Sequence, residues 1–135
     1  MNSSLIPDFT RYTLALLEGD RMIYSARGGG LRPLWDALEK FQEKSGLILH
    51  DKVTGLAAAR LIVRSGIVDE IFTMVVSLPA REFLQNHGIA LNAFEVTASI
   101  LTKDKGAVCP GEVIALSHSG SDEFTQNIKG LLGVL

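Results

Sequence analysis

The side chains that could do chemistry in this sequence gather at two glycine-containing junctions. Gly28–Pro33 reads Gly-Gly-Gly-Leu-Arg-Pro, and His50–Gly55 reads His-Asp-Lys-Val-Thr-Gly. Glycines ahead of a helix let the backbone approach a ligand, and the unpaired N–H groups of a helix's first turn attract anions. Two such junctions at one edge of a sheet would place small, basic and acidic groups around one site.

The second junction supplies two candidate catalytic residues, Asp51 and Lys52. Lys52 could bind an anionic substrate or carry a proton, with Asp51 holding or opposing its charge. Thr54 follows as a candidate ligand contact. Two alternatives stay open: Asp51 and Lys52 could be a solvated pair that closes a strand, or Asp51 could cap the following helix.

The first junction supplies candidate ligand contacts at Gly29, Gly30 and Arg32. An arginine can make a two-pronged contact with phosphate or carboxylate. The alternative is a surface arginine in a first helical turn, with glycines that only reverse the chain. The loop has neither the Lys-Ser/Thr ending of a P-loop nor the spacing of a dinucleotide-binding fingerprint.

A third candidate group is Cys109, which precedes Pro110, together with Glu112. A helix N-terminus at this point could lower the pKa of the thiol and support nucleophilic catalysis, while Glu112 could contact the ligand or complete a helix cap. The alternative is a small buried apolar residue. As the only cysteine, Cys109 excludes an internal disulfide and an all-cysteine zinc site.

The three histidines do not form a metal-binding pattern. None of His50, His87 and His118 is paired with another ligand at metal-binding spacing. We therefore expect no metal and no cofactor, with His87 explained by its place before Gly88 at a helix end.

The apolar spacing predicts an α/β fold whose mixed sheet begins with a β-hairpin and carries helices on both faces. Ala90–Leu101 fits strand or helix and is left open. The expected elements are a hairpin of Phe9–Leu17 and Arg21–Ala26, strands Leu47–His50 and Ile71–Val76, helices Leu31–Lys44 and Thr54–Arg64, a helix opened by Pro79 and closed by Gly88, and a helix Ser121–Leu132.

Composition sets the broad class. With 135 residues, 47% of them hydrophobic, the chain fits one domain with a helical tail from about residue 121. A net charge of −2 argues against stable binding to nucleic acid or an anionic membrane surface. No signal peptide or membrane span is apparent, so we expect a cytoplasmic protein.

Three sequence islands stand out together: Gly30-Leu31-Arg32-Pro33-Leu34, Asp51-Lys52-Val53-x-Gly55-x-Ala57-Ala58-Ala59 and Cys109-Pro110-x-Glu112. As a set they resemble a prokaryotic family known as domain of unknown function family 1893, over roughly Tyr12 to Leu116. The resemblance implies a three-layer α/β/α cytidine-deaminase-like fold without an established activity. A zinc deaminase needs a His or Cys with a Glu at one helix start and two Cys at the next, and neither junction supplies that set.

These observations favour a domain that binds an anionic or nucleotide-like small molecule without zinc, with catalysis left open. A structural or interaction module with a vestigial site, self-associating through its apolar tail, is the alternative. A zinc-dependent nucleoside deaminase is the third hypothesis.

Overall fold

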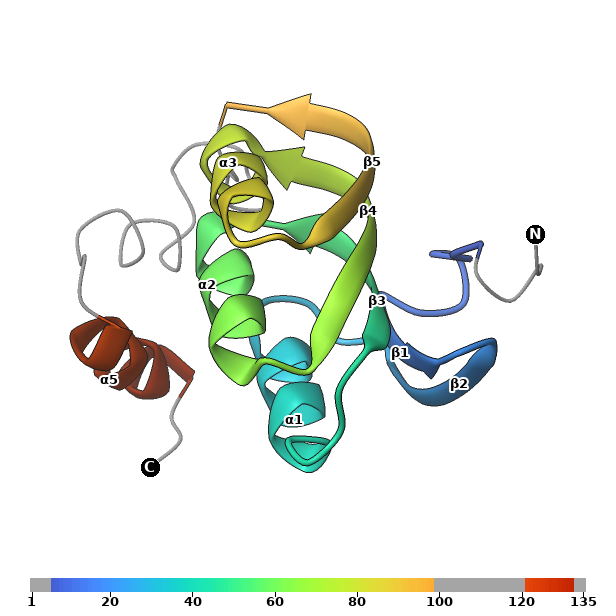
Figure 1. Ribbon diagram of the computed structural model, residues 1–135, viewed down its shortest axis with the longest axis horizontal. Coiled ribbons are helices and arrows are strands. Elements are labelled where there is room, and N and C mark those ends of the chain that lie inside the picture. Colours follow the sequence, from blue (N-terminus) through green and yellow to red (C-terminus); the bar gives the residue numbers. More distant parts are fainter. Residues whose placement is uncertain (1–5, 99–120, 133–135) are drawn as a thin grey trace.

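The computed structural model describes residues 6–98 and 121–132, which form an α/β fold around one five-stranded sheet (Figure 1). Its elements are β1 (Leu14–Glu18), β2 (Arg21–Ala26), α1 (Arg32–Lys40), β3 (Leu47–Thr54), α2 (Leu56–Ser65), β4 (Val68–Ser77), α3 (Leu78–Asn86), β5 (Ala90–Thr97) and α5 (Ser121–Leu132). Ala90–Thr97, left open by its periodicity, is a strand. No helix in these residues is long and apolar enough to cross a membrane.

The sheet is mixed, with the strand order β2-β1-β3-β4-β5. β1 runs antiparallel to β2 and to β3, whereas β3, β4 and β5 are parallel. The predicted hairpin is confirmed, but its first strand begins at Leu14 instead of Phe9, because the segment before it packs across the sheet. Its tight turn contains Gly19 with a φ of 63°, a conformation that favours glycine. Parallel strands need long crossovers, which α2 and α3 provide.

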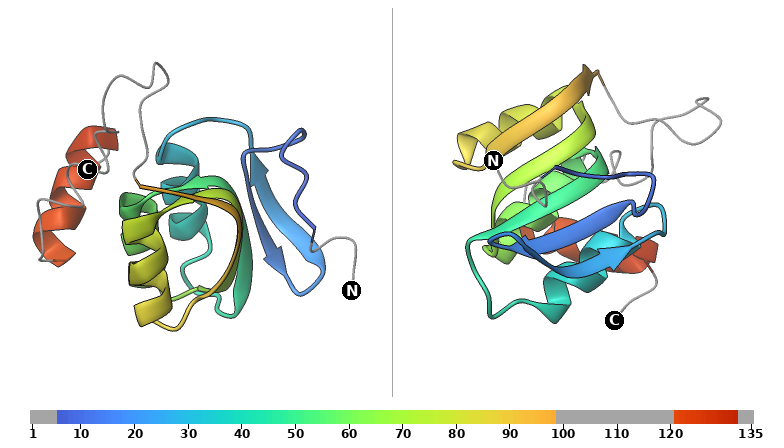
Figure 2. Two further views of the ribbon diagram at one scale, coloured as in Figure 1. Left: turned by 90° about the horizontal axis from the view of Figure 1, so that it is seen from above. Right: turned by 90° about the vertical axis from the view of Figure 1, so that its right-hand side faces the viewer.

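The layers differ from the prediction in one respect. The described elements form three layers, but α1, α2 and α3 cover one face of the sheet and α5 lies outside them, whereas we expected helices on both faces (Figure 2). The connections β2-α1-β3, β3-α2-β4 and β4-α3-β5 all advance in the same direction across the sheet. Because such crossovers are right-handed, helices on connections that advance in one direction fall on one face.

The opposite face of the sheet is covered in part by the segment that precedes β1. Phe9 and Tyr12 pack there against Ala15 and Leu17 of β1 and Ile48 of β3. The main core lies on the helix side and includes Leu16, Leu49 and Ile71 from the sheet, Leu34 and Leu38 from α1, Ala59 and Ile62 from α2, and Phe124 and Ile128 from α5.

Two predicted boundaries beside the candidate site are wrong. β3 continues to Thr54 instead of ending at His50, and α2 begins at Leu56 instead of Thr54. The strand continues because β4 pairs with it up to Thr54 and because the Lys52 N–H donates to the Thr13 carbonyl (2.9 Å). Long-range pairing thus overrides a polar local sequence. The helix α1 is also shorter than predicted and ends at Lys40.

The start of α3 gives a stability prediction. Buried Ser77 accepts a hydrogen bond from the Ala80 N–H at 3.3 Å, as an N-cap does. We expect Ser77→Ala to lower the free energy of unfolding by about 1 kcal/mol in a urea titration, and exposed Ser45→Ala to change it little. Equal stability of the two variants would contradict a capping role.

Candidate functional site

The two junctions meet at one edge of the sheet, with Thr13 between them. The Thr13 carbonyl accepts from the Lys52 N–H, and the Thr13 N–H donates to the Ala26 carbonyl (2.8 Å). The Thr13 hydroxyl donates to the Gly28 carbonyl at 2.6 Å. Because β1 is antiparallel to β2 and β3, its start lies beside their ends. The structure therefore brings the glycine loop and the end of β3 together.

Within β3, however, Asp51 and Lys52 are separated. Successive side chains of a strand point to opposite faces. Asp51 follows Leu49 toward the helix layer and is 9% exposed, whereas Lys52 follows His50 to the other face and is exposed. The Lys52 ammonium forms no hydrogen bond or ion pair with the described residues. The two candidate residues therefore do not share one crevice.

Asp51 belongs to a buried chain of hydroxyl groups. The Thr54 Oγ1 lies 3.3 Å from Asp51 Oδ2 and 3.0 Å from Thr73 Oγ1, and the Thr73 hydroxyl is 3.0 Å from the Val75 carbonyl. Each hydroxyl has one proton to donate. If Thr73 donates to Val75 and Thr54 donates to Thr73, a protonated Asp51 completes the chain by donating to Thr54; an ionised Asp51 instead draws the Thr54 proton to itself.

Burial raises the pKa of Asp51 from 3.8 to about 7, and the Thr54 hydrogen bond opposes this only in part. Both protonation states are thus accessible near neutral pH. The second carboxylate oxygen, Oδ1, has no hydrogen-bond partner among the described residues. Directly after this strand α2 begins, and Gly55 at its N-cap has no side chain of its own to accept a hydrogen bond from the first turn. The arrangement can offer a proton to a ligand oxygen or nitrogen.

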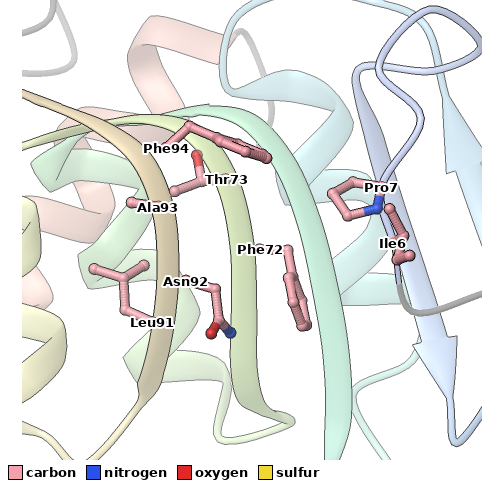
Figure 3. Close-up of a pocket in the computed structure, with 8 residues that line it drawn as sticks. All are labelled: Ile6, Pro7, Phe72, Thr73, Leu91, Asn92, Ala93 and Phe94. Atoms are coloured by element: carbon pink, nitrogen blue, oxygen red, sulfur yellow. The ribbon is translucent and has the colours of Figure 1, made fainter. Parts of the chain in front are cut away.

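A cavity of about 470 Å³ lies at the face opposite the helices (Figure 3). The residues lining it are Ile6, Pro7, Phe72, Thr73, Leu91, Asn92, Ala93 and Phe94. Sequence reasoning missed all of them. Phe94 is 84% exposed, and an exposed aromatic residue in an edge strand is the one signal that could have pointed here, once Ala90–Thr97 was assigned as a strand.

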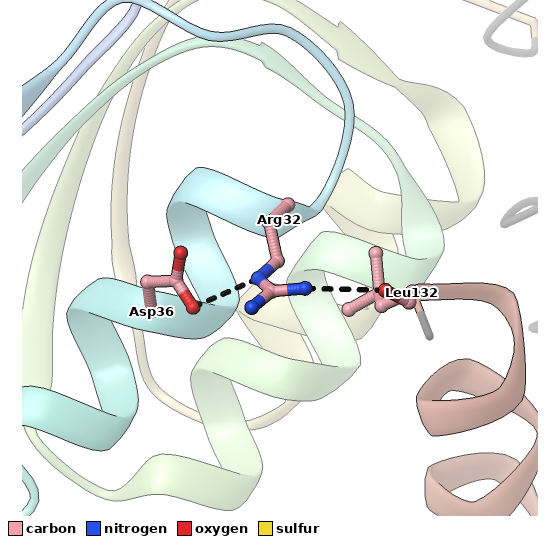
Figure 4. A network of polar contacts seen from close by, with 3 residues as sticks. All are labelled: Arg32, Asp36 and Leu132. Carbon is pink, nitrogen blue, oxygen red and sulfur yellow. Dashed lines mark hydrogen bonds and ion pairs between the residues drawn. The ribbon is translucent and has the colours of Figure 1, made fainter. Parts of the chain in front are cut away.

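Arg32 is committed to contacts within the chain (Figure 4). Its Nε forms an ion pair with Asp36 Oδ1 at 3.0 Å, and its Nη1 donates to the Leu132 carbonyl at 3.2 Å. The guanidinium thus joins the start of α1 to the end of α5. A two-pronged contact with a ligand would have to displace these bonds.

The glycines beside Arg32 have different requirements. Gly30 has a φ of 73°, so the turn itself favours glycine at this position. A Cβ added at Gly29 or Gly30 would meet no atom of another described residue within 4 Å, so neither glycine is required by close packing. Ligand contact at Gly29 and Gly30 stays a prediction.

Three of the remaining candidates cannot be placed. Cys109, Glu112 and His118 lie outside the described residues. Of the other histidines, buried His50 has its Nδ1 2.8 Å from the Tyr12 hydroxyl and packs edge-on against Phe72. No group of three metal-ligating side chains occurs in residues 6–98 and 121–132.

Comparison with known proteins yields a family and a fold. The family described as "Domain of unknown function (DUF1893)" matches residues 8–132. The chain is similar to the crystal structure of a DUF1893 family protein (TM1506) from Thermotoga maritima, with 26% sequence identity and a TM-score of 0.81 over 90% of this chain and 81% of that one. No curated protein matches. The chain therefore belongs to the DUF1893 family of domains of unknown function.

Proposed function

We propose that this protein binds an anionic or nucleotide-like small molecule, without zinc, where the end of β3 meets the start of α2. The observation that carries the proposal is the position of Asp51: its carboxyl group is nearly buried, yet Oδ1 lacks a hydrogen-bond partner among the described residues. Oδ1 is not fully buried, so a ligand at this edge of the sheet can reach it and supply a partner.

With its proton on Oδ1, Asp51 would donate a hydrogen bond to a phosphoryl or carbonyl oxygen of the ligand, while Oδ2 accepts one from the Thr54 hydroxyl. The N-terminus of α2 adds a favourable potential for negative charge. The same proton could be transferred to a bound substrate, so the site is compatible with acid-base catalysis, with Asp51 as the group that holds the proton. Binding is the primary function in this proposal.

We also infer that the α/β fold is of the cytidine-deaminase-like class. The support is the strand order β2-β1-β3-β4-β5 together with the three sequence islands. The ligand site would then occupy the edge where the parallel strands end, which is where α/β sheets commonly bind ligands.

The proposal predicts a binding affinity that depends on the protonation of Asp51. With nucleoside monophosphates and sugar phosphates in the presence of EDTA, we expect thermal shift and calorimetry to give affinities about tenfold higher at pH 6 than at pH 8, because the pKa of Asp51 is about 7. Asp51→Asn keeps a hydrogen-bond donor without a proton to lose, so its binding should lack the part of the pH dependence that Asp51 contributes.

Exposed Asp69→Asn is the matched control for the change in charge and should retain the wild-type pH dependence. The phosphate groups of these ligands also titrate near pH 6. The decisive quantity is therefore, for each ligand, the difference between wild type and Asp51→Asn in how the affinity changes with pH. If the two proteins show the same pH dependence, or if only added zinc permits binding, Asp51 does not have the proposed role.

One observation favours the alternative of an interaction module. β5 is an end strand of the described sheet, and Phe94 and Val96 on it are exposed. Unprotected edge strands can pair with another chain. Light scattering on the same preparation tests this alternative: a dimer that Phe94→Asp dissociates, with no small molecule bound, would favour the interaction module.

A further inference from the structure

The cavity on the open face of the sheet has the form of a small-molecule site. Figure 3 shows the side chains of Phe72, Asn92 and Phe94 on the side of β4 and β5 that faces Pro7 and Ile6, while Leu91 extends the other way. Its volume, about 470 Å³, lies within the range of known ligand sites. Two strands and the segment before β1 therefore form its walls.

The aromatic side chains offer surfaces for a flat ring. Phe94 is 84% exposed, which leaves its ring in water unless a ligand covers it. Phe72 packs edge-on against its cross-strand neighbour His50, with the ring centroids 5.5 Å apart. One fixed and one accessible aromatic ring are typical of a site that stacks a planar ligand.

Asn92 adds a polar contact of fixed orientation. Its Nδ2 donates to Glu70 Oε2 at 3.1 Å and to the Ile71 carbonyl at 3.3 Å. Both N–H groups of the amide are thus used, and Oδ1, which has no partner among the described residues, remains as an acceptor. The ligand group that suits it is an N–H donor.

Opposite charges lie toward the two ends of this face. The strand registers place Lys52, Met74 and Phe94 in one row across β3, β4 and β5. Lys52 is exposed and has no ion-pair partner among the described residues. Glu70, which holds the Asn92 amide, lies four residues before Met74 along β4. An anionic group is therefore favoured at the Lys52 end and an amino group near Asn92.

We propose that this cavity binds an amino-substituted aromatic ring that carries an anionic group, the chemistry of an adenine or cytosine nucleotide. The ring stacks on Phe94, its amino group donates to Asn92 Oδ1, and its phosphate contacts Lys52. This site lies on the face of the sheet opposite Asp51 and is separate from the proposed ligand site there.

Calorimetry with AMP and CMP tests the proposal. We expect at least one of the two nucleotides to bind the wild-type protein. Adenosine and cytidine lack the anion, and ribose 5-phosphate lacks the ring, so each should bind at least about tenfold more weakly than the nucleotide. Lys52→Met and Phe94→Ala should each weaken the nucleotide about tenfold. Both positions are exposed, so neither change should impair folding. Lys44→Met, which removes a cation that pairs with Glu18, should bind as wild type.

The outcomes separate the two sites. Binding that Lys52→Met and Phe94→Ala reduce and Asp51→Asn retains supports the cavity, whatever happens at Asp51. Absence of binding by both nucleotides, equal binding of ribose 5-phosphate, or loss of binding only in Asp51→Asn would overturn this inference. The last result would instead favour the ligand site at the end of β3.

Discussion

Asp51→Asn is expected to be about 4 kcal/mol more stable than the wild-type protein at pH 8 and about equally stable near pH 4. The folded protein holds the pKa of Asp51 at about 7, against an ordinary value of 3.8. Folding therefore favours the protonated carboxyl group. This contribution is complete in acid and is lost as the pH rises from about 4 through 7, at about 1.4 kcal/mol for each pH unit between the two pKa values.

An amide has the shape of the protonated carboxyl group and cannot ionise, so the variant should lack this pH dependence. Urea unfolding at intervals between pH 4 and pH 8 measures the difference. Asp69→Asn removes an exposed carboxylate and serves as the control. A wild-type protein and an Asp51→Asn variant whose stabilities change in parallel with pH would show that Asp51 is ionised in the folded state at neutral pH.

The hairpin and the alternation of strands and helices could be predicted because their signals are local. Gly19 marks a tight turn between two apolar runs, and Pro79 and Gly88 bracket a helix. The placement of helices on one face could not be predicted in this way. It depends on the order of the strands in the sheet, and that order arises from pairing between distant segments.

In the candidate site, too, the features that depend on local sequence could be predicted and those that depend on distant segments could not. Sequence spacing correctly brings the glycine loop and Asp51 to one edge of the sheet. It does not reveal that β3 continues through Thr54, which sends Asp51 and Lys52 to opposite faces. That continuation depends on a partner strand and on the Thr13 carbonyl, 39 residues before Lys52. The partner of Arg32, the Leu132 carbonyl, is 100 residues away and equally hidden.

The contacts of α5 bear on whether this helix belongs to the expected single domain. Phe124 and Ile128 of α5 are 1% and 0% exposed and belong to the core that α1, α2 and the sheet share. The Arg60 guanidinium of α2 lies 4.1 Å from the centroid of the Phe124 ring, a cation-π contact. Arg32 adds its bond to Leu132. These contacts predict that α5 unfolds together with the rest of the domain.

We therefore expect Ile128→Ala to lower the free energy of unfolding by about 2–5 kcal/mol, as for other large-to-small changes in a core. Urea unfolding followed by circular dichroism should show one transition, displaced to lower urea. Exposed Gln126→Ala on the same helix should change the stability by less than about 0.5 kcal/mol. If α5 docks through Phe124 and Ile128, the unfilled cavity left by Ile128→Ala must lower the free energy of unfolding of the protein. Similar small effects of both substitutions would therefore mean that α5 contributes little to the core.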